Sequence, residues 1–164
     1  MSSPPARAAT ISISTSRAGG KGVDVSGERL AAFARGLGLA LAGSDLIADE
    51  RAVIEARLRH WSDVECCSLI LTTGGTGLSP TDLTPEATRA VIEREVPGIS
   101  EAMRLASRAH TPNWMLSRAT AGLRGASLII NFPGSPASID QTGEAIAPAI
   151  AHALSLISGA SSGH

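Results

Sequence analysis

The sequence is poor in aromatic residues and has no excess of charge of either sign. Its 164 residues include two Trp, two Phe and no Tyr. Platforms that stack nucleic-acid bases need aromatic faces, so this scarcity argues against a nucleic-acid partner. The 14 Lys and Arg residues are balanced by 15 Asp and Glu residues, for a net charge of −1. A global field that would attract nucleic acid or a membrane surface is therefore not expected.

Cysteines are also scarce, and long apolar runs are missing. The two cysteines, Cys66 and Cys67, are adjacent, and a disulfide between neighbours is strained, so we expect free thiols. No apolar run approaches the ~20 residues that a membrane-spanning helix needs, and the N-terminus does not resemble a signal peptide. These features favour a cytoplasmic protein with no membrane partner.

The segment from Leu69 to Ala87 is the most informative stretch of the chain. An apolar, β-prone run leads into a glycine-rich loop, residues 73–77, and then into a helix start. We expect Thr84 to cap that helix and Pro85 to occupy its first turn. The N–H groups of such a junction suit an anion, most often a phosphate. Asp82, between this loop and the helix start, would repel an anion, unless a metal ion lies between them.

Elsewhere, predicted strands alternate with predicted helices. Strands are expected at residues 8–14, 39–47 (with a bulge at Gly43), 67–72 and 126–132, with a short edge strand or turn at 121–125. Helices are expected from residues 24–27 to Gly36 and Gly38, from residues 49–50 to Trp61, at 85–95, at 99–110 and from residues 133–136 to Ile157. The polar residues 15–22 are expected to form a loop, and residues 111–118 have room for a short helix.

This alternation predicts an α/β fold. We expect a three-layer sandwich with a mainly parallel central sheet and helices on both faces. Residues 8–157 are expected to form a single domain, between a flexible N-terminal tail at 1–7 and a flexible C-terminal tail at 158–164.

Four polar elements follow strand ends in this scheme. They are Ser14, Asp49, residues 74–82 and residues 133–136. Ligands of such sheets bind beyond the carboxyl ends of the strands, so these elements are expected to form one rim. Positive charge for an anionic ligand can come from Arg17, Lys21, Arg89 or Arg118.

The residues alone leave alternatives open. The glycine loop is not a P-loop, because no Gly-Lys-Ser/Thr follows at the required spacing, and Pro80 replaces the third glycine of a dinucleotide fingerprint. Taken singly, Asp49 can be a helix-start charge and Asp82 a turn cap. Taken together on one edge of the sheet, they suggest a metal-binding or proton-handling pair that faces a phosphate.

The combined motifs resemble a known family. Thr-Thr-Gly-Gly-Thr-Gly at 72–77 and Asp-Leu-Thr-Pro-Glu-Ala at 82–87 resemble the signature of the MogA/MoaB family of molybdenum-cofactor biosynthesis proteins. Further matching segments are residues 24–27, 48–50, 93–98, 115–118, 121–125 and 133–136, and the resemblance covers about residues 11–157. Leu-Ser-Arg at 116–118 and the motif after Asp82 are similar to the MogA branch, which includes a plant G domain.

The resemblance implies a molybdopterin adenylyltransferase, which joins the adenylyl group of ATP to molybdopterin and releases pyrophosphate before molybdate insertion. It implies that Asp49 and Asp82 are catalytic and bind Mg2+. It also implies a homotrimer, with a molybdenum insertase as a partner. The candidate substrate-binding residues are Ser14, Thr73, Gly74, Gly75, Thr76, Gly77, Ser117, Pro133, Gly134, Ser135 and Pro136.

Three sites differ from the pattern of the resembled family. Thr15 stands where Asp or Asn is usual, Glu28 where Pro is frequent, and Pro80-Thr81 where a basic residue is usual. The changes at Thr15 and Thr81 keep a second hypothesis open, a molybdopterin-binding paralogue with little or no catalytic activity. A third hypothesis is a subunit whose sheet rim only scaffolds a larger assembly.

Overall fold

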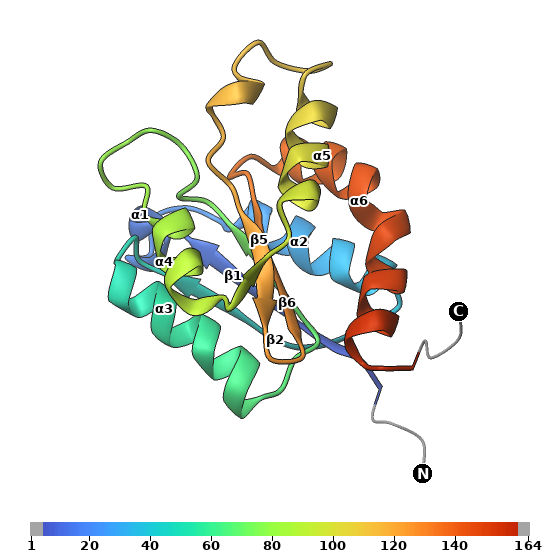
Figure 1. The fold of residues 1–164 in the computed structure, drawn as a ribbon. Coiled ribbons are helices and arrows are strands. Elements are labelled where there is room, and N and C mark those ends of the chain that lie inside the picture. The colour runs from blue at the N-terminus through green and yellow to red at the C-terminus, as the bar shows by residue number, and fades with distance from the viewer. Residues whose placement is uncertain (1–4, 161–164) are drawn as a thin grey trace.

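A six-stranded sheet in the order β2-β1-β3-β6-β5-β4 forms the middle layer of the computed structural model, which describes residues 5–160 (Figure 1). The strands are β1 (Arg7–Ile13), β2 (Ala40–Ile47), β3 (Leu69–Thr73), β4 (Arg94–Glu95), β5 (Ala121–Arg124) and β6 (Ser127–Phe132). β1, β2, β3 and β6 run parallel to one another, β5 pairs antiparallel with β6, and β4 pairs antiparallel with β5 at the edge of the sheet. This arrangement confirms the predicted α/β fold with a mainly parallel sheet.

Helices cover both faces of the sheet. They are α1 (Thr15–Ala18), α2 (Val25–Gly36), α3 (Arg51–Arg59), the π-helical η1 (His60–Val64), α4 (Thr84–Val91), α5 (Pro97–Ser107), the 3-10 turn η2 (Trp114–Leu116) and α6 (Pro136–Ile157). In Figure 1, α2, α5 and α6 lie on one side of the sheet and α3 and α4 on the other. The predicted three-layer sandwich is confirmed.

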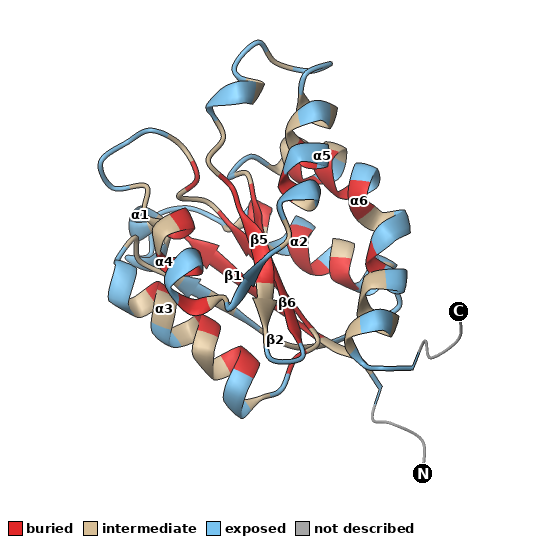
Figure 2. Ribbon diagram, in the orientation of Figure 1, coloured by how far each residue is buried: buried red, intermediate tan, exposed pale blue. Residues whose placement is uncertain are grey.

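Each inner strand supplies apolar side chains to two cores. Leu69 and Leu71 of β3 pack in the cluster with α2, α5 and α6, whereas Ile70 between them packs in the cluster with α3 and α4. Alternate residues of a strand point to opposite faces, so a strand that is covered on both sides is apolar throughout. Figure 2 shows the consequence, with buried residues concentrated on the central strands.

The strands lie close to their expected places. The predictions for 8–14, 39–47, 67–72 and 126–132 match β1, β2, β3 and β6 within two residues at each end. The expected bulge is present too: Ala8 and Ala9 of β1 pair with Leu41 and Gly43 of β2, which leaves one residue between them without a partner.

The helix predictions for 85–95 and 99–110 were partly wrong. α4 ends at Val91, because Glu93 N donates a hydrogen bond to Leu123 O (2.8 Å) and Val96 N to Ala121 O (2.9 Å), which makes the intervening residues the edge strand β4. α5 begins at Pro97 and ends at Ser107. Proline is tolerated in a first helical turn, where its missing N–H would have no helical partner.

Two local predictions near the sheet rim also need correction. Thr84 is not the N-cap of α4: the cap is Leu83, and Thr84 Oγ1 donates to Gly74 O at 2.9 Å. Part of the expected loop at 15–22 is the one-turn helix α1, whose N-cap Ser14 accepts a hydrogen bond from Arg17 N. Both changes tie the strand ends to the elements that follow them.

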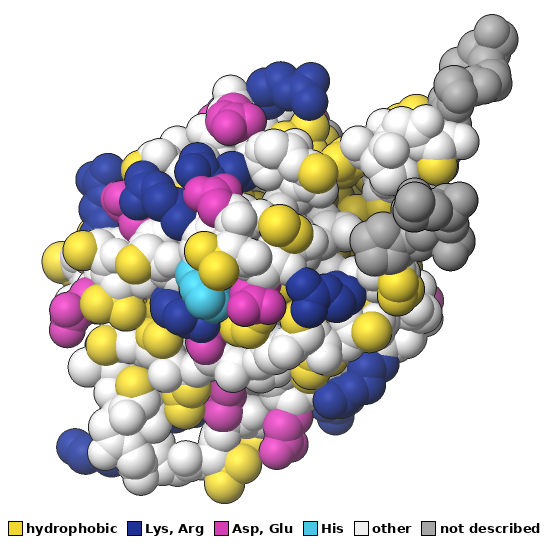
Figure 3. Space-filling view, turned by 90° about the horizontal axis from the view of Figure 1, so that it is seen from below, with side chains coloured by type: hydrophobic (Ala, Val, Ile, Leu, Met, Phe, Trp, Pro, Cys, Tyr) yellow, Lys and Arg dark blue, Asp and Glu magenta, His cyan; other side chains and the backbone are white. Residues whose placement is uncertain are grey.

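Residues 1–4 and 161–164 of the two expected tails lie outside the described residues, and Arg7 begins β1. Basic and acidic side chains are interspersed on the face in Figure 3.

Cys66 and Cys67 are free thiols, and burial raises the pKa of Cys67. Between residues 5 and 160, no helix is both long and apolar enough to cross a membrane.

Candidate functional site

A cavity of about 200 Å3, here called the central cavity, lies at the carboxyl ends of the parallel strands. Its lining comes from the last residues of β1 and β3, from the residues that follow β1, β2, β3 and β6, and from the start of α2. The lining residues are Ser12, Ile13, Ser14, Arg17, Asp24, Ser26, Asp49, Thr73, Gly74, Gly75, Asp82 and Gly134. The structure thus brings members of all four expected rim elements together.

The glycine loop has a conformation and a packing that exclude side chains. Gly74 has φ +95°, and a Cβ there would lie 2.3 Å from Ile13 O. Gly75 has φ +66°, and a Cβ would lie 2.3 Å from Thr84 Oγ1. None of the hydrogen bonds found within residues 5–160 uses the N–H of Gly75, Thr76 or Gly77 as a donor. These three amides can therefore serve a ligand.

Asp49 is held in place by the first turn after β1. Its Oδ2 accepts hydrogen bonds from Thr15 N (2.9 Å) and Thr15 Oγ1 (3.0 Å). Asp49 N in turn lies 3.0 Å from Thr15 Oγ1. Asp49 Oδ1 lies 3.4 Å from the position of a Cβ on Gly75. One carboxylate oxygen is thus anchored to Thr15, and the other lies beside the glycine loop.

Asp82 borders the same loop from its far end. Its Oδ2 accepts a hydrogen bond from Ser79 N at 3.0 Å and lies 2.9 Å from the position of a Cβ on Gly77. Asp49 and Asp82 therefore flank the Gly75–Gly77 turn, and both line the central cavity.

The candidate cations differ in what they do. Arg17 lines the central cavity. Arg118 donates instead to Gly77 O (2.8 Å), to Asp82 O (2.7 Å) and to the Glu86 carboxylate. The hydrogen bond from Arg118 lowers the pKa of Glu86, against the opposing effect of desolvation. Arg89 pairs with Glu95 at 3.8 Å.

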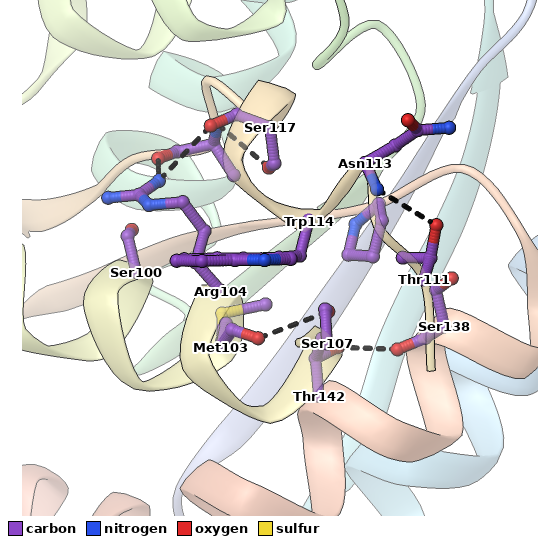
Figure 4. A pocket seen from close by; sticks show the side chains of 12 residues that line it. Ser100, Met103, Arg104, Ser107, Thr111, Asn113, Trp114, Ser117, Ser138 and Thr142 are labelled. Carbon is purple, nitrogen blue, oxygen red and sulfur yellow. Dashed lines mark hydrogen bonds between the residues drawn. The ribbon is translucent and has the colours of Figure 1, made fainter. Parts of the chain in front are cut away.

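A second cavity, here called the side cavity, measures about 120 Å3 and opens between α5, the loop around η2 and α6 (Figure 4). Arg104 reaches from α5 to Ala119 O (2.9 Å) and Ser117 O (3.4 Å). Ser100 Oγ is buried there and has no hydrogen-bond partner. The lining residues are Ser100, Met103, Arg104, Ser107, Thr111, Asn113, Trp114, Ser117, Ala119, Pro133, Ser138 and Thr142.

The candidate site residues divide between the two cavities. Ser14, Thr73, Gly74, Gly75, Gly134 and both aspartates line the central cavity, and Ser117 and Pro133 line the side cavity. Thr76 and Gly77 accept hydrogen bonds from Arg118 through their carbonyls. Ser135 is the N-cap of α6 and Pro136 begins that helix, and neither lines a cavity described above.

Sequence reasoning missed several residues of both cavities. Ser26 Oγ donates to Gly134 O at 2.6 Å and so joins α2 to the last rim element. Asp24, which lines the central cavity, caps α2 and belongs to the motif at 24–27, so a signal for it existed. Ser100 and Trp114 carry no local signal, because their cavity forms only where α5 meets the loop around η2.

The donors present fit a Mg2+ ion that is shared with a phosphate ligand. Within the described part of the chain, no group of three or more His, Cys, Asp or Glu residues could hold a metal. Mg2+ is commonly bound by one or two carboxylates together with substrate phosphates, rather than by an all-protein cage. Two carboxylates beside a turn with available N–H groups match that pattern.

The fold and the site define the class of protein: a three-layer α/β domain with a cavity at the carboxyl ends of parallel strands. The family model for a probable molybdopterin binding domain matches residues 9–152. The chain belongs to this family.

Individual relatives agree with this assignment. The crystal structure of MoaB from Thermus thermophilus, a molybdopterin biosynthesis enzyme, superposes with a TM-score of 0.87 at 43% identity over 93% of this chain and 96% of that one. The structure of the Mog protein of Mycobacterium ulcerans superposes with a TM-score of 0.87 at 36% identity, over 93% of this chain and 99% of that one. A Helicobacter pylori molybdopterin adenylyltransferase is 47% identical over 115 residues, which is 70% of this chain and 65% of the relative, slightly under two thirds of its length.

Proposed function

We propose that this protein is an enzyme of molybdenum cofactor biosynthesis that transfers the adenylyl group of Mg-ATP to molybdopterin, giving adenylyl-molybdopterin and pyrophosphate. The observation that carries the proposal is the pair Asp49 and Asp82 on either side of the Gly75–Gly77 turn in one cavity. The name of the Helicobacter pylori relative supports the same activity.

The chemistry needs positioning more than covalent help from the protein. An oxygen of the molybdopterin phosphate bonds to the α-phosphorus of ATP, while the bond from that phosphorus to the pyrophosphate oxygen breaks. The amides of Gly75, Thr76 and Gly77 would hold the acceptor phosphate. Asp49 and Asp82 would hold Mg2+, which supplies positive charge to the nucleotide phosphates.

The side cavity fits the acceptor end of the reaction. Ser117 and Pro133 line it, and Gly134, the next residue, lines the central cavity. Trp114 offers an aromatic face to a planar ring, and the buried Ser100 Oγ lacks a partner that a polar ring atom could provide. A pterin there would have its phosphate directed toward the glycine loop.

We further propose that the chain works as a homotrimer in the cytoplasm and passes its product to a molybdenum insertase. The family resemblance supports the trimer and the insertase. The free thiols of Cys66 and Cys67 suit a reducing compartment. Light scattering coupled to gel filtration tests the trimer directly.

Asp82→Asn tests the metal-ligand role. Asparagine keeps an oxygen that can accept from Ser79 N but loses the negative charge. We expect pyrophosphate release from Mg-ATP and molybdopterin to fall by about 100-fold, as when one group that stabilises transition-state charge is removed, while molybdopterin binding stays nearly unchanged. Turnover near that of the wild type would contradict the role.

A matched control is Asp140→Asn, which makes the same change at an exposed carboxylate. Asp140 Oδ2 lies 2.7 Å from the guanidinium of Arg29 on α2. We expect wild-type turnover from this variant. If the unaltered protein binds molybdopterin tightly but releases no pyrophosphate, the non-catalytic paralogue is the better assignment.

A further inference from the structure

Arg118 is placed to support the loop that carries Asp82. Its Nε donates to Gly77 O at 2.8 Å, one terminal nitrogen donates to Asp82 O at 2.7 Å, and the other pairs with the Glu86 carboxylate. Its backbone N donates to Thr76 O at 2.9 Å. One arginine therefore contacts both ends of the segment between Gly77 and Asp82.

That segment has few other supports. Residues 78–81 are exposed, and the hydrogen bonds of their side chains are local, between Ser79, Thr81 and Asp82. The Thr84 hydroxyl fixes the start of α4 to Gly74 O, beyond the segment itself. The hydrogen bonds from Arg118 to the carbonyl oxygens of Gly77 and Asp82 thus connect an exposed turn to the body of the domain.

The position of Arg118 in the chain adds a second consequence. Ser117, the preceding residue, lines the side cavity, whereas Asp82 lines the central cavity. The dipeptide Ser117-Arg118 therefore presents a group to one cavity and holds a carboxylate at the edge of the other. A shift of this dipeptide would move both groups together.

We propose that Arg118 is a positioning residue for adenylyl transfer, which acts by fixing the Gly77–Asp82 turn so that the Asp82 carboxylate stays directed at the central cavity. This inference rests on the proposed function. It departs from a role in binding substrate phosphate, because the guanidinium already donates to two carbonyls and one carboxylate. A carboxylate misplaced by about 1 Å can cost on the order of 100-fold in rate.

The test compares Arg118→Gln with Arg124→Gln. Arg124 is a close match, because it also donates to a carboxylate, Asp63, and to a backbone carbonyl, Val91 O, but it lies on β5. We expect Arg118→Gln to lower kcat by about 30- to 100-fold and to raise the Mg2+ concentration needed for half-maximal rate, with KM for molybdopterin changed less than about threefold. Arg124→Gln is expected to retain wild-type kcat.

Arg118→Lys provides the rescue. Its ammonium can reach one or two of the same acceptors, so kcat should recover to within about tenfold of wild type. Equal kinetics for the two glutamine variants would overturn the proposal. A large rise in KM for molybdopterin at unchanged kcat would also overturn it, since that result assigns Arg118 to substrate binding.

Hydrogen exchange of the ligand-free protein gives a readout that does not depend on turnover. Faster exchange in peptides covering residues 76–83 of Arg118→Gln, but not of Arg124→Gln, supports the positioning role, and unchanged exchange overturns it. If the wild type releases no pyrophosphate, the proposed function fails, while this measurement still decides whether Arg118 holds the turn.

Discussion

At the scale of single residues, Thr15 shows how a departure from the family pattern can serve the site. It stands where the resembled family usually has Asp or Asn, yet both its N–H and its hydroxyl donate to Asp49 Oδ2. A hydroxyl bonded to a carboxylate can fix that group without adding a further negative charge to a site for phosphates. Thr15 therefore supports catalysis by Asp49 in the proposed function.

Thr15→Val tests this support, because valine preserves the branched shape and the backbone N–H but removes the hydroxyl. A hydrogen bond to a charged group contributes about 1.5 kcal/mol, so we expect the rate of pyrophosphate release to fall about tenfold. Thr15→Ser should restore most of that rate. A valine variant with full activity, or a serine variant as slow as valine, would show that the hydroxyl does not position Asp49.

At the scale of elements, α6 and α2 meet at a close approach. A Cβ on Gly143 of α6 would lie 2.9 Å from the ring of Phe33 on α2, and that ring is held by Phe132 of β6 at a centroid distance of 5.4 Å. Gly143→Ala should therefore push two helices apart and lower the free energy of unfolding by about 1–3 kcal/mol.

Gly98→Ala is the matched control for this contact. Gly98 lies in the first turn of α5, and a Cβ there has nothing within 4 Å. We expect this variant to be as stable as the wild type or up to about 1 kcal/mol more stable, because alanine favours the helix. Urea unfolding of both variants checks the pair, and equal stabilities would contradict a tight α2–α6 contact.

Most strands of the sheet could be predicted from the sequence, but the edge strand β4 could not. β1, β3 and β6 follow from short apolar runs, and the rim follows from the polar residues at their ends. β4 could not be predicted, because its two residues are extended only through pairing with β5, far along the chain. A local pattern predicted a helix there, and tertiary hydrogen bonds determined a strand.

The candidate site divides in a similar way. Asp49, Asp82 and the glycine loop could be proposed because motif and strand order place them together. The hydrogen bonds of Arg118 could not be predicted, because the acceptors at Gly77, Asp82 and Glu86 precede it by more than 30 residues. The sequence indicates which charged side chains are present, but not which carbonyl oxygens accept hydrogen bonds from each guanidinium.

At the scale of the whole molecule, three carboxylates link stability to pH. Hydrogen bonds from arginine lower the pKa of Glu55, Asp63 and Glu86 in the folded state. A lowered pKa means that the stabilisation is fully present above the ordinary carboxylate value of ~4 and is lost as pH falls through the folded pKa. The free energy of unfolding should therefore decrease as the protein is taken from pH 6 toward pH 3.

Glu86→Gln isolates the share of the Glu86–Arg118 pair in this pH dependence. The variant cannot gain a proton at this position, so its stability should fall less steeply below pH 5 than that of the wild type. Arg118→Gln should flatten the curve in the same way, because the interaction that lowers the pKa of Glu86 is then gone. Urea unfolding at each pH gives the three slopes. If the two variants kept the wild-type slope, the Glu86–Arg118 pair would not contribute to the pH dependence of stability. If both flatten, protonation of Glu86 weakens its pairing with Arg118, the residue that contacts the Asp82 turn.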